Sequence, residues 1–314
     1  MSTRVVFMGS PDFALPVLES LAEQYDVVGV ITQPDRPAGR GRVLTLPPVK
    51  QLAIELQLPV IQPRRLREPE AMDTLRSWQP DLIVVAAFGQ ILRLDVLSLP
   101  PFGCVNVHAS LLPRWRGAAP IQAAILNGDD KTGITTMLMD PGVDTGPILS
   151  QRAIPISPEE TAGSLAPRLA LLGADLLIET LPVYLSGQLQ PQPQDEALAS
   201  YAPMLKKEDG LLDFSQPAAH LALKVRAFNP WPGAYTIWQG ETLKIHQAHA
   251  VEPVDHSNGT MPEPGRTTVY SGLPAITTSR GLLALDELQP AGKRSMPGKA
   301  FLLGARGWGE SSET

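Results

Sequence analysis

The sequence predicts an α/β protein in which a Rossmann-like, doubly wound and mainly parallel sheet is followed by a small β-barrel (OB-like) C-terminal domain. Three observations indicate this fold. Residues 4–32 read as a strand, a helix and a second strand, which is how a doubly wound sheet begins. Residues 81–87 form a nearly continuous apolar run, typical of a strand covered by helices on both faces. Beyond residue 207, short alternating segments are separated by glycine and proline turns, as in a small barrel.

The first elements follow from apolar spacing. We expect a strand over residues 4–8, a helix over 13–24, where leucines recur at roughly helical spacing, and a second strand over 26–32. The turn between the first strand and the helix carries only Gly9 of the glycines that a dinucleotide-binding turn requires. A nicotinamide cofactor is therefore disfavoured.

The same reasoning places the rest of the first half. A helix is expected to end near Leu97. A short strand that runs into a loop is expected within residues 104–113, and further strands are expected at 133–139 and 148–156, before a long amphipathic helix at 161–186. A polar, proline-rich segment follows, which suits a semi-rigid linker. We therefore expect a first domain at 1–187, a linker at 188–206 and a C-terminal domain at 207–314.

Composition excludes several classes of protein. The chain has 314 residues, which favours two domains. Its one cysteine, Cys104, excludes an intramolecular disulfide and a cysteine-based zinc site. We see no export signal and no apolar run long enough to span a membrane, so we expect a cytoplasmic protein.

The net charge of −6 argues against extensive binding of nucleic acid, but basic residues gather locally. Residues 33–42 hold two prolines, two glycines and three arginines, and we interpret them as a mobile basic loop at the carboxyl end of the second strand. Ligands of open α/β sheets bind at that edge. Between residues 36 and 67 the basic residues are Arg36, Arg40, Arg42, Lys50, Arg64, Arg65 and Arg67.

The segment that begins at Cys104 carries polar side chains where a buried strand should be apolar. Because side chains alternate along a strand, Asn106 and His108 share one face and Val105 and Val107 share the other. An amide and an imidazole could hold an oxyanion or steer a proton. Alternatively, His108 is a core histidine bonded to the backbone and Asn106 caps the strand end.

The turn Asp140-Pro-Gly-Val-Asp-Thr-Gly146 presents two carboxylates. We assign Asp140 to capping the turn. Asp144 is the better candidate for chemistry, because a carboxylate near an imidazole can orient the ring or accept a proton.

Asn106-Val-His-Ala-Ser-Leu-Leu-Pro113 and the turn at 140–146 together resemble the signature of the 10-formyltetrahydrofolate-dependent formyltransferases. The resemblance extends over nearly the whole chain. It includes the segments Gly9-Ser-Pro-Asp-Phe13, Gln33-Pro-Asp-Arg-Pro-Ala-Gly-Arg-Gly41, Leu111-Leu-Pro-Arg-Trp-Arg-Gly-Ala-Ala-Pro120, Arg226-Ala-Phe-Asn-Pro-Trp-Pro232 and Leu288-Gln-Pro-Ala-Gly-Lys293. Within the family, the basic loop and the C-terminal segments resemble the members that act on methionyl initiator tRNA.

The resemblance implies that a formyl group moves from 10-formyltetrahydrofolate, the co-substrate, to the α-amine of methionyl initiator tRNA. It implies Asn106, His108 and Asp144 as catalytic residues, with no metal. Asn106 and a protonated His108 would stabilise the oxyanion, and Asp144 would stabilise the imidazolium and relay the amine proton. The resemblance gives the folate residues as Ser110, Leu111, Leu112 and Pro113, and the tRNA residues as Arg36, Arg40, Arg42 and Lys293. We expect a monomer that binds no membrane.

Three other functions stay open at this point. The first is a formyltransferase that acts on an amino sugar nucleotide, which would share the Asn106, His108 and Asp144 set. The second is a formyltetrahydrofolate hydrolase, with water as acceptor. The third is a non-catalytic RNA-binding protein on a degenerate Rossmann-like core.

Overall fold

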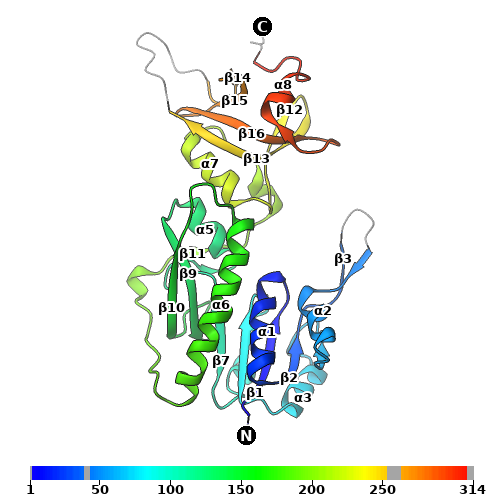
Figure 1. Cartoon of the computed structure of the whole chain (residues 1–314), viewed down its shortest axis with the longest axis vertical. Coiled ribbons are helices and arrows are strands. Elements are labelled where there is room, and N and C mark those ends of the chain that lie inside the picture. Colours follow the sequence, from blue (N-terminus) through cyan, green and yellow to red (C-terminus); the bar gives the residue numbers. More distant parts are fainter. Residues whose placement is uncertain (1, 39–42, 253–262, 310–314) are drawn as a thin grey trace. The chain divides into compact units, whose positions relative to one another are not determined.

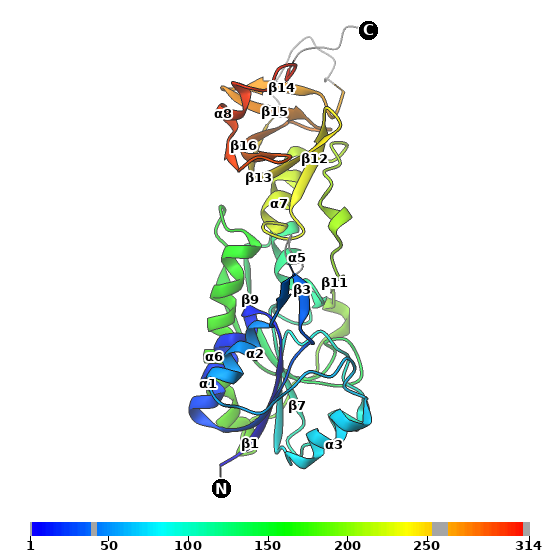
Figure 2. The same cartoon turned by 90° about the vertical axis from the view of Figure 1, so that its right-hand side faces the viewer.

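The computed structural model describes residues 2–38, 43–252 and 263–309 (Figures 1 and 2). The chain divides into two compact units. Unit 1 comprises residues 1–120, 131–155 and 165–203. Unit 2 comprises residues 121–130, 156–164 and 204–314. Each unit therefore combines segments that are far apart in the sequence.

A seven-stranded sheet forms the centre of unit 1, in the order β10-β9-β7-β6-β1-β2-β5. Neighbouring strands from β7 to β5 run parallel, whereas β9 is antiparallel to both β7 and β10. The expected mainly parallel, Rossmann-like sheet is therefore confirmed. Its strands are β1 (Arg4–Gly9), β2 (Asp26–Ile31), β5 (Val60–Ile61), β6 (Leu82–Ala86), β7 (Cys104–His108), β9 (Lys131–Leu138) and β10 (Ile148–Pro155).

Helices cover both faces of this sheet (Figure 2). Met72 and Leu75 of α3 pack with side chains of β1, β6 and β7 in one cluster, which also holds Cys104. On the other face, α6 approaches β7 closely, since a Cβ on Gly173 would lie 2.8 Å from Val107. The helices are α1 (Leu15–Gln24), preceded by the 3-10 turn η1 (Asp12–Ala14), α2 (Pro48–Glu55), α3 (Pro69–Ser77), α4 (Leu94–Leu97) and α6 (Ala162–Leu185).

The segment after β6 differs from the expected helix. Only α4 is helical, whereas residues 88–93 are irregular. Gly89 has a φ of +76°, which a helix does not allow. The side chain of Gln90 accepts a hydrogen bond from Leu66 N at 3.0 Å and donates one to Pro63 O at 3.4 Å. These bonds hold the segment against the chain that follows β5.

Two further pairs of short strands shape unit 1. β3 (Arg36–Ala38) and β4 (Val43–Thr45) are antiparallel, so part of the expected 33–42 loop is a strand that pairs with the residues after the loop. β8 (Arg116–Gly117) and β11 (Tyr201–Ala202) pair in parallel and bring the end of the expected linker beside the segment that follows β7.

An antiparallel sheet forms the core of unit 2 and confirms the β domain expected beyond residue 207. Its order is β12-β13-β16-β15-β14, and β17 pairs with β16. The strands are β12 (Ala234–Trp238), β13 (Glu241–Val251), β14 (Thr267–Tyr270), β15 (Leu273–Thr277), β16 (Leu282–Pro290) and β17 (Met296–Pro297). Its helices are α7 (Ala218–Ala227), α8 (Gly298–Leu302) and most of α5 (Pro120–Leu126).

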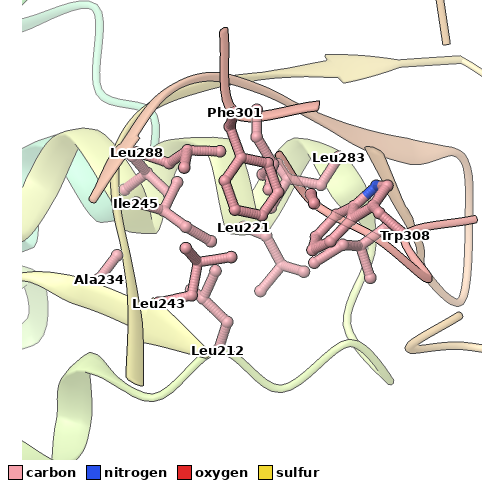
Figure 3. Packing of buried hydrophobic residues seen from close by; sticks show 13 residues of the cluster. Leu212, Leu221, Ala234, Leu243, Ile245, Leu283, Leu288, Phe301 and Trp308 are labelled. Atoms are coloured by element: carbon pink, nitrogen blue, oxygen red, sulfur yellow. The ribbon is translucent and has the colours of Figure 1, made fainter. Parts of the chain in front are cut away.

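The buried residues of unit 2 come from both its helices and its sheet and form one cluster. Leu221 of α7, Ile245 of β13 and Leu288 of β16 pack together with Phe301 of α8 (Figure 3). Phe301 and Trp308 lie edge to face with centroids 5.2 Å apart, a favourable arrangement of aromatic rings. This core gives the C-terminal part its own hydrophobic centre.

Of the helices in the part of the chain that the structure describes, none combines the length and the apolar character that a membrane span requires.

Candidate functional site

The candidate site lies where the strand order of the sheet reverses. The chain runs from β1 outward to β2 and β5, then returns to β6 on the other side of β1. Open α/β sheets bind ligands at the carboxyl edge of the strands beside such a switch point. β7 lies next to β6, with Asn106 opposite Val85, so the polar end of β7 faces this edge.

Asn106 and His108 are placed by the alternation of β7. Val107 packs against α6 on one face of the sheet, whereas Cys104 belongs to the cluster on the face that α3 covers. Asn106 and His108 share the face of Cys104 and are 8% and 6% exposed. Polar side chains that are this deeply buried need hydrogen-bond partners, and both Asn106 and His108 have polar partners.

The turn after β9 holds the carboxylate that meets them. Asp140 Oδ1 accepts hydrogen bonds from Gly142 N at 3.0 Å and from Thr145 Oγ1 at 2.6 Å, so Asp140 caps the turn. A Cβ on Gly146 would lie 1.9 Å from a backbone carbonyl oxygen of β9, which explains the glycine. Asp144 itself has a φ of +53°, a conformation in which Asp is tolerated better than most residues.

Three groups from different parts of the chain lie against the Asp144 carboxylate. Asn106 Nδ2 donates to Asp144 Oδ1 at 3.4 Å, and His108 Nδ1 lies 3.6 Å from Oδ2. The backbone N–H of Gly117 donates to Oδ2 at 2.8 Å. The structure therefore brings together the three side chains that the sequence predicts as catalytic. It adds the Gly117 N–H, for which the sequence gives no signal because the hydrogen bond depends on the tertiary fold.

The tautomer of His108 follows from its second contact. His108 Nε2 lies 3.0 Å from the backbone carbonyl oxygen of Trp115. A carbonyl oxygen only accepts, so we assign the proton to Nε2. Nδ1 is then the nitrogen that faces Asp144 and the one that can gain a proton beside a carboxylate. The group as a whole offers an amide donor, a ring nitrogen and a carboxylate within one small site.

The four predicted folate residues lie directly after β7. Ser110 is fully buried, and its Oγ donates to Arg114 O at 2.6 Å. Leu112 is 3% exposed, and its backbone is tied to β9 and β10 through Thr135 and Gln151. Only Leu111 and Pro113 of the four have partly exposed side chains. Contact with a ligand is thus easiest for these two.

The predicted tRNA residues are spread over the chain. Arg36 is exposed in β3, and its Nη2 donates to Gln33 Oε1 at 3.3 Å. Arg40 and Arg42 lie outside the described residues. Lys293 is exposed and belongs to unit 2. The two described residues of this set, Arg36 and Lys293, therefore belong to different units.

A cavity of about 160 Å³ opens where the irregular segment after β6 meets the chain that follows β5. It is lined by Arg65, Leu66, Arg67, Gln90, Ile91, Arg93, Asp95 and Val96. The lining includes three arginines and one carboxylate, and the other side chains are largely apolar. The sequence indicates Arg65 and Arg67 as part of a basic region but gives no signal for Ile91 and Arg93, because their segment is expected to be a helix.

Metal ligation finds no support among residues 2–38, 43–252 and 263–309. No group of three or more His, Cys, Asp or Glu side chains there could hold a metal ion.

Comparison with known proteins identifies the family of the chain. Residues 3–181 match the family described as "Formyl transferase", and residues 204–306 match "Formyl transferase, C-terminal domain". The chain is 49% identical to the methionyl-tRNA formyltransferase of Roseiflexus sp. (strain RS-1), over 98% of this chain and 94% of the relative. It is 50% identical to that of Myxococcus xanthus (strain DK1622), over 96% of this chain and 95% of the relative.

A solved structure supports the fold. HypX from Aquifex aeolicus, in complex with tetrahydrofolic acid, matches with a TM-score of 0.60 at 18% identity. The match covers 99% of this chain and 49% of that one, so this chain spans about half the length of HypX. The two family matches and the identity over nearly the whole length lead to one conclusion: the chain belongs to the methionyl-tRNA formyltransferase family.

Proposed function

We propose that this chain transfers the formyl group of 10-formyltetrahydrofolate to the α-amine of methionyl initiator tRNA. The observation that carries the proposal is the meeting of Asn106 and His108 at Asp144, in a chain about half identical to methionyl-tRNA formyltransferases. The folate supplies an activated one-carbon unit. The residues of the chain orient it, stabilise charge and move a proton.

Asn106 and His108 act on the formyl oxygen. As the amine nitrogen bonds to the formyl carbon, negative charge develops on that oxygen, and preorganised donors in a dry site stabilise it. The Asn106 amide offers an N–H, and His108 offers a second one once Nδ1 is protonated. Their low exposure means that little water competes for the oxygen.

Asp144 acts on the proton. The new carbon–nitrogen bond forms while the bond from the formyl carbon to the folate nitrogen breaks, so one proton must leave the amine and one must reach the folate nitrogen. Asp144 Oδ2 lies 3.6 Å from His108 Nδ1 and stabilises the imidazolium, while the carboxylate accepts the amine proton directly or through water and passes a proton on to the folate nitrogen. The Gly117 N–H keeps this carboxylate in place.

The folate would lie along Leu111 and Pro113 and extend to the arginine-lined cavity. A folate carries an aromatic benzoyl group and a glutamate with two carboxylates. The cavity joins apolar walls at Ile91 and Val96 to the guanidinium groups of its arginines, which suits these two parts. It also lies beyond β6, the strand that pairs with β7.

Arg93→Ala tests the folate's position. We expect the KM for 10-formyltetrahydrofolate to rise roughly tenfold, with kcat nearly unchanged, since a charge-assisted hydrogen bond made equally before and during reaction is lost. Arg76→Ala, at an exposed arginine of α3, should leave both constants unchanged. With 10-formyltetrahydropteroate, which lacks the glutamate, Arg93→Ala and the unmodified protein should behave alike. A tenfold difference with that donor as well would contradict the assignment of the cavity.

Arg40→Ala and Arg36→Ala test the proposed contact with the tRNA. Of these two arginines, Arg36 lies within the described residues. For each variant we expect the KM for the tRNA to rise roughly three- to tenfold, with the folate KM unchanged. If the arginine meets a phosphate, the slope of log affinity against log salt should fall by about one. An equal loss of folate affinity would contradict the role of the 33–42 loop, and Arg76→Ala again serves as the control.

Transfer of labelled formyl groups decides the function. The protein is given 10-formyltetrahydrofolate with methionyl initiator tRNA, with methionyl elongator tRNA, or with an amino sugar nucleotide. We expect transfer to the initiator tRNA alone. Transfer to the sugar, or release of labelled formate to water without any acceptor, would replace the proposal by one of the alternative reactions.

A further inference from the structure

The segment expected as a linker forms part of the wall of the candidate site. Gln192 exchanges two backbone hydrogen bonds with Ile148 at 2.7 and 2.8 Å. Farther along, Ser200 Oγ accepts from Trp115 N at 3.0 Å, next to the carbonyl that holds His108. The pairing of β11 with β8 follows directly. Between these two anchors lies Gln194.

All four hydrogen-bonding positions of the Gln194 side chain are occupied. Its Nε2 donates to the backbone carbonyls of Asp144 at 2.8 Å and Gly146 at 2.7 Å. Its Oε1 accepts from Arg116 Nε at 3.0 Å and Nη2 at 2.9 Å. An amide flip would place the oxygen against two carbonyls and the NH2 against a guanidinium, so the contacts fix the orientation.

Arg116 is the anchor of this arrangement. It is fully buried, and a buried guanidinium needs both a counter-charge and saturated donors. Glu196 supplies the charge through Oε2 and Oε1, at 2.9 Å from Nη1 and 2.8 Å from Nη2. Arg116 also precedes Gly117, whose N–H holds the Asp144 carboxylate. Arg116 therefore supports both parts of Asp144. Its side chain holds Gln194, which binds the Asp144 backbone, and the residue after it, Gly117, binds the Asp144 carboxylate.

We propose that Gln194 is a positioning residue for the reaction and acts through Asp144. Its amide fixes the left-handed backbone at Asp144, where φ is +53°, and thereby aims the carboxylate at His108. Gln194 does not touch the reacting atoms. The inference rests on the proposed formyl transfer and concerns the same site.

The test compares three variants in the formyl-transfer assay with saturating initiator tRNA and folate. Gln194→Ala removes all four hydrogen bonds. Gln194→Glu keeps the size and the contact with Arg116 but replaces the NH2 by an oxygen that faces two carbonyls. Gln192→Ala, on the same segment, removes a side chain whose one hydrogen bond is to the nearby Gln190 O, and serves as the matched control.

We expect Gln194→Ala to lower kcat by about 10- to 100-fold, because a misplacement of the order of 1 Å at a catalytic group costs about 100-fold. The KM values for both substrates should stay within roughly threefold, since the residue touches neither of them. Gln194→Glu should lose at least as much, and Gln192→Ala should match the unmodified protein. Circular dichroism and the midpoint of thermal unfolding show which variants are folded at the assay temperature.

A double-mutant cycle separates positioning from general damage. In an Asp144→Ala background, measured in single turnover, adding Gln194→Ala should cost less than about twofold, because the group that it positions is already gone. An equal loss in both backgrounds would overturn the inference. So would a Gln194→Glu variant with full kcat, because it would show that the bonds to the Asp144 and Gly146 carbonyls do not matter.

Failure of the proposed function would look different. If the unmodified protein transfers no formyl group to the initiator tRNA, the proposed reaction is wrong, and the positioning role of Gln194, which rests on that reaction, is overturned with it. If the unmodified protein is active and Gln194→Ala raises a KM at constant kcat, Gln194 is a binding residue and the positioning role is wrong.

Discussion

Replacing Asp144 by Asn is expected to lower kcat for formyl transfer by roughly 100- to 1,000-fold, while the protein stays folded. Asn can still accept the Gly117 N–H through its oxygen, so the turn should keep its shape. The variant lacks the negative charge that stabilises a protonated His108 and the carboxylate that accepts a proton. Steady-state rates at saturating substrate measure the effect, and the midpoint of thermal unfolding checks the fold.

The same turn offers a matched control in Asp140→Asn. Asp140 makes its two hydrogen bonds as an acceptor, and the Asn side chain oxygen can accept both. We expect the activity of this variant to stay within roughly threefold of the unmodified protein. Equal losses at Asp140 and Asp144 would mean that charge in the turn matters in general, and would contradict a specific role of Asp144.

Asn106→Ala should likewise lose on the order of 100- to 1,000-fold in kcat, as found when one oxyanion donor is removed. Asn106→Asp is a sharper test, because it keeps the size and exchanges the donor for an acceptor beside the Asp144 carboxylate. We expect it to be at least as inactive. Asn127→Ala, at an exposed helix end, should have no effect on turnover.

Folate retention completes this test. Asn106→Ala should bind the folate with nearly unchanged affinity in ultrafiltration, since the donor acts mainly after the amine attacks. Near-normal turnover in either Asn106 variant would contradict the assignment of this residue to the oxyanion.

The sequence predicts those parts of the site that depend on local periodicity. The alternation of β7 places Asn106 and His108 on one face, and the glycines after β9 indicate the turn that carries Asp144. Both signals come from a few neighbouring residues, and the structure agrees with them. The mainly parallel sheet is predictable for the same reason, from apolar runs of the right length.

Contacts between distant segments were not predictable. Gly117 meets Asp144 across 27 positions, and Gln194 meets Asp144 across 50. Neither pair produces a periodic pattern in the sequence, because each hydrogen bond forms only once the sheet and the segment 192–202 are folded. The helix expected between Gly89 and Leu97 is wrong over residues 90–93, because the tertiary contacts of Gln90 with Leu66 and Pro63 outweigh local helical preference there.

The division of the chain into two units determines whether either unit can be exchanged as a single segment of sequence. The boundary is crossed near residues 120, 130, 155, 164 and 203, so neither unit is one continuous piece of sequence. Residues 121–130 and 156–164 precede residue 165, well before the C-terminal sheet begins in the sequence, yet they belong to the same unit as that sheet. Unit 1 and unit 2 therefore cannot each be exchanged as one continuous segment of sequence. A recombination point anywhere in the gene would leave one of the two units without a segment of its own.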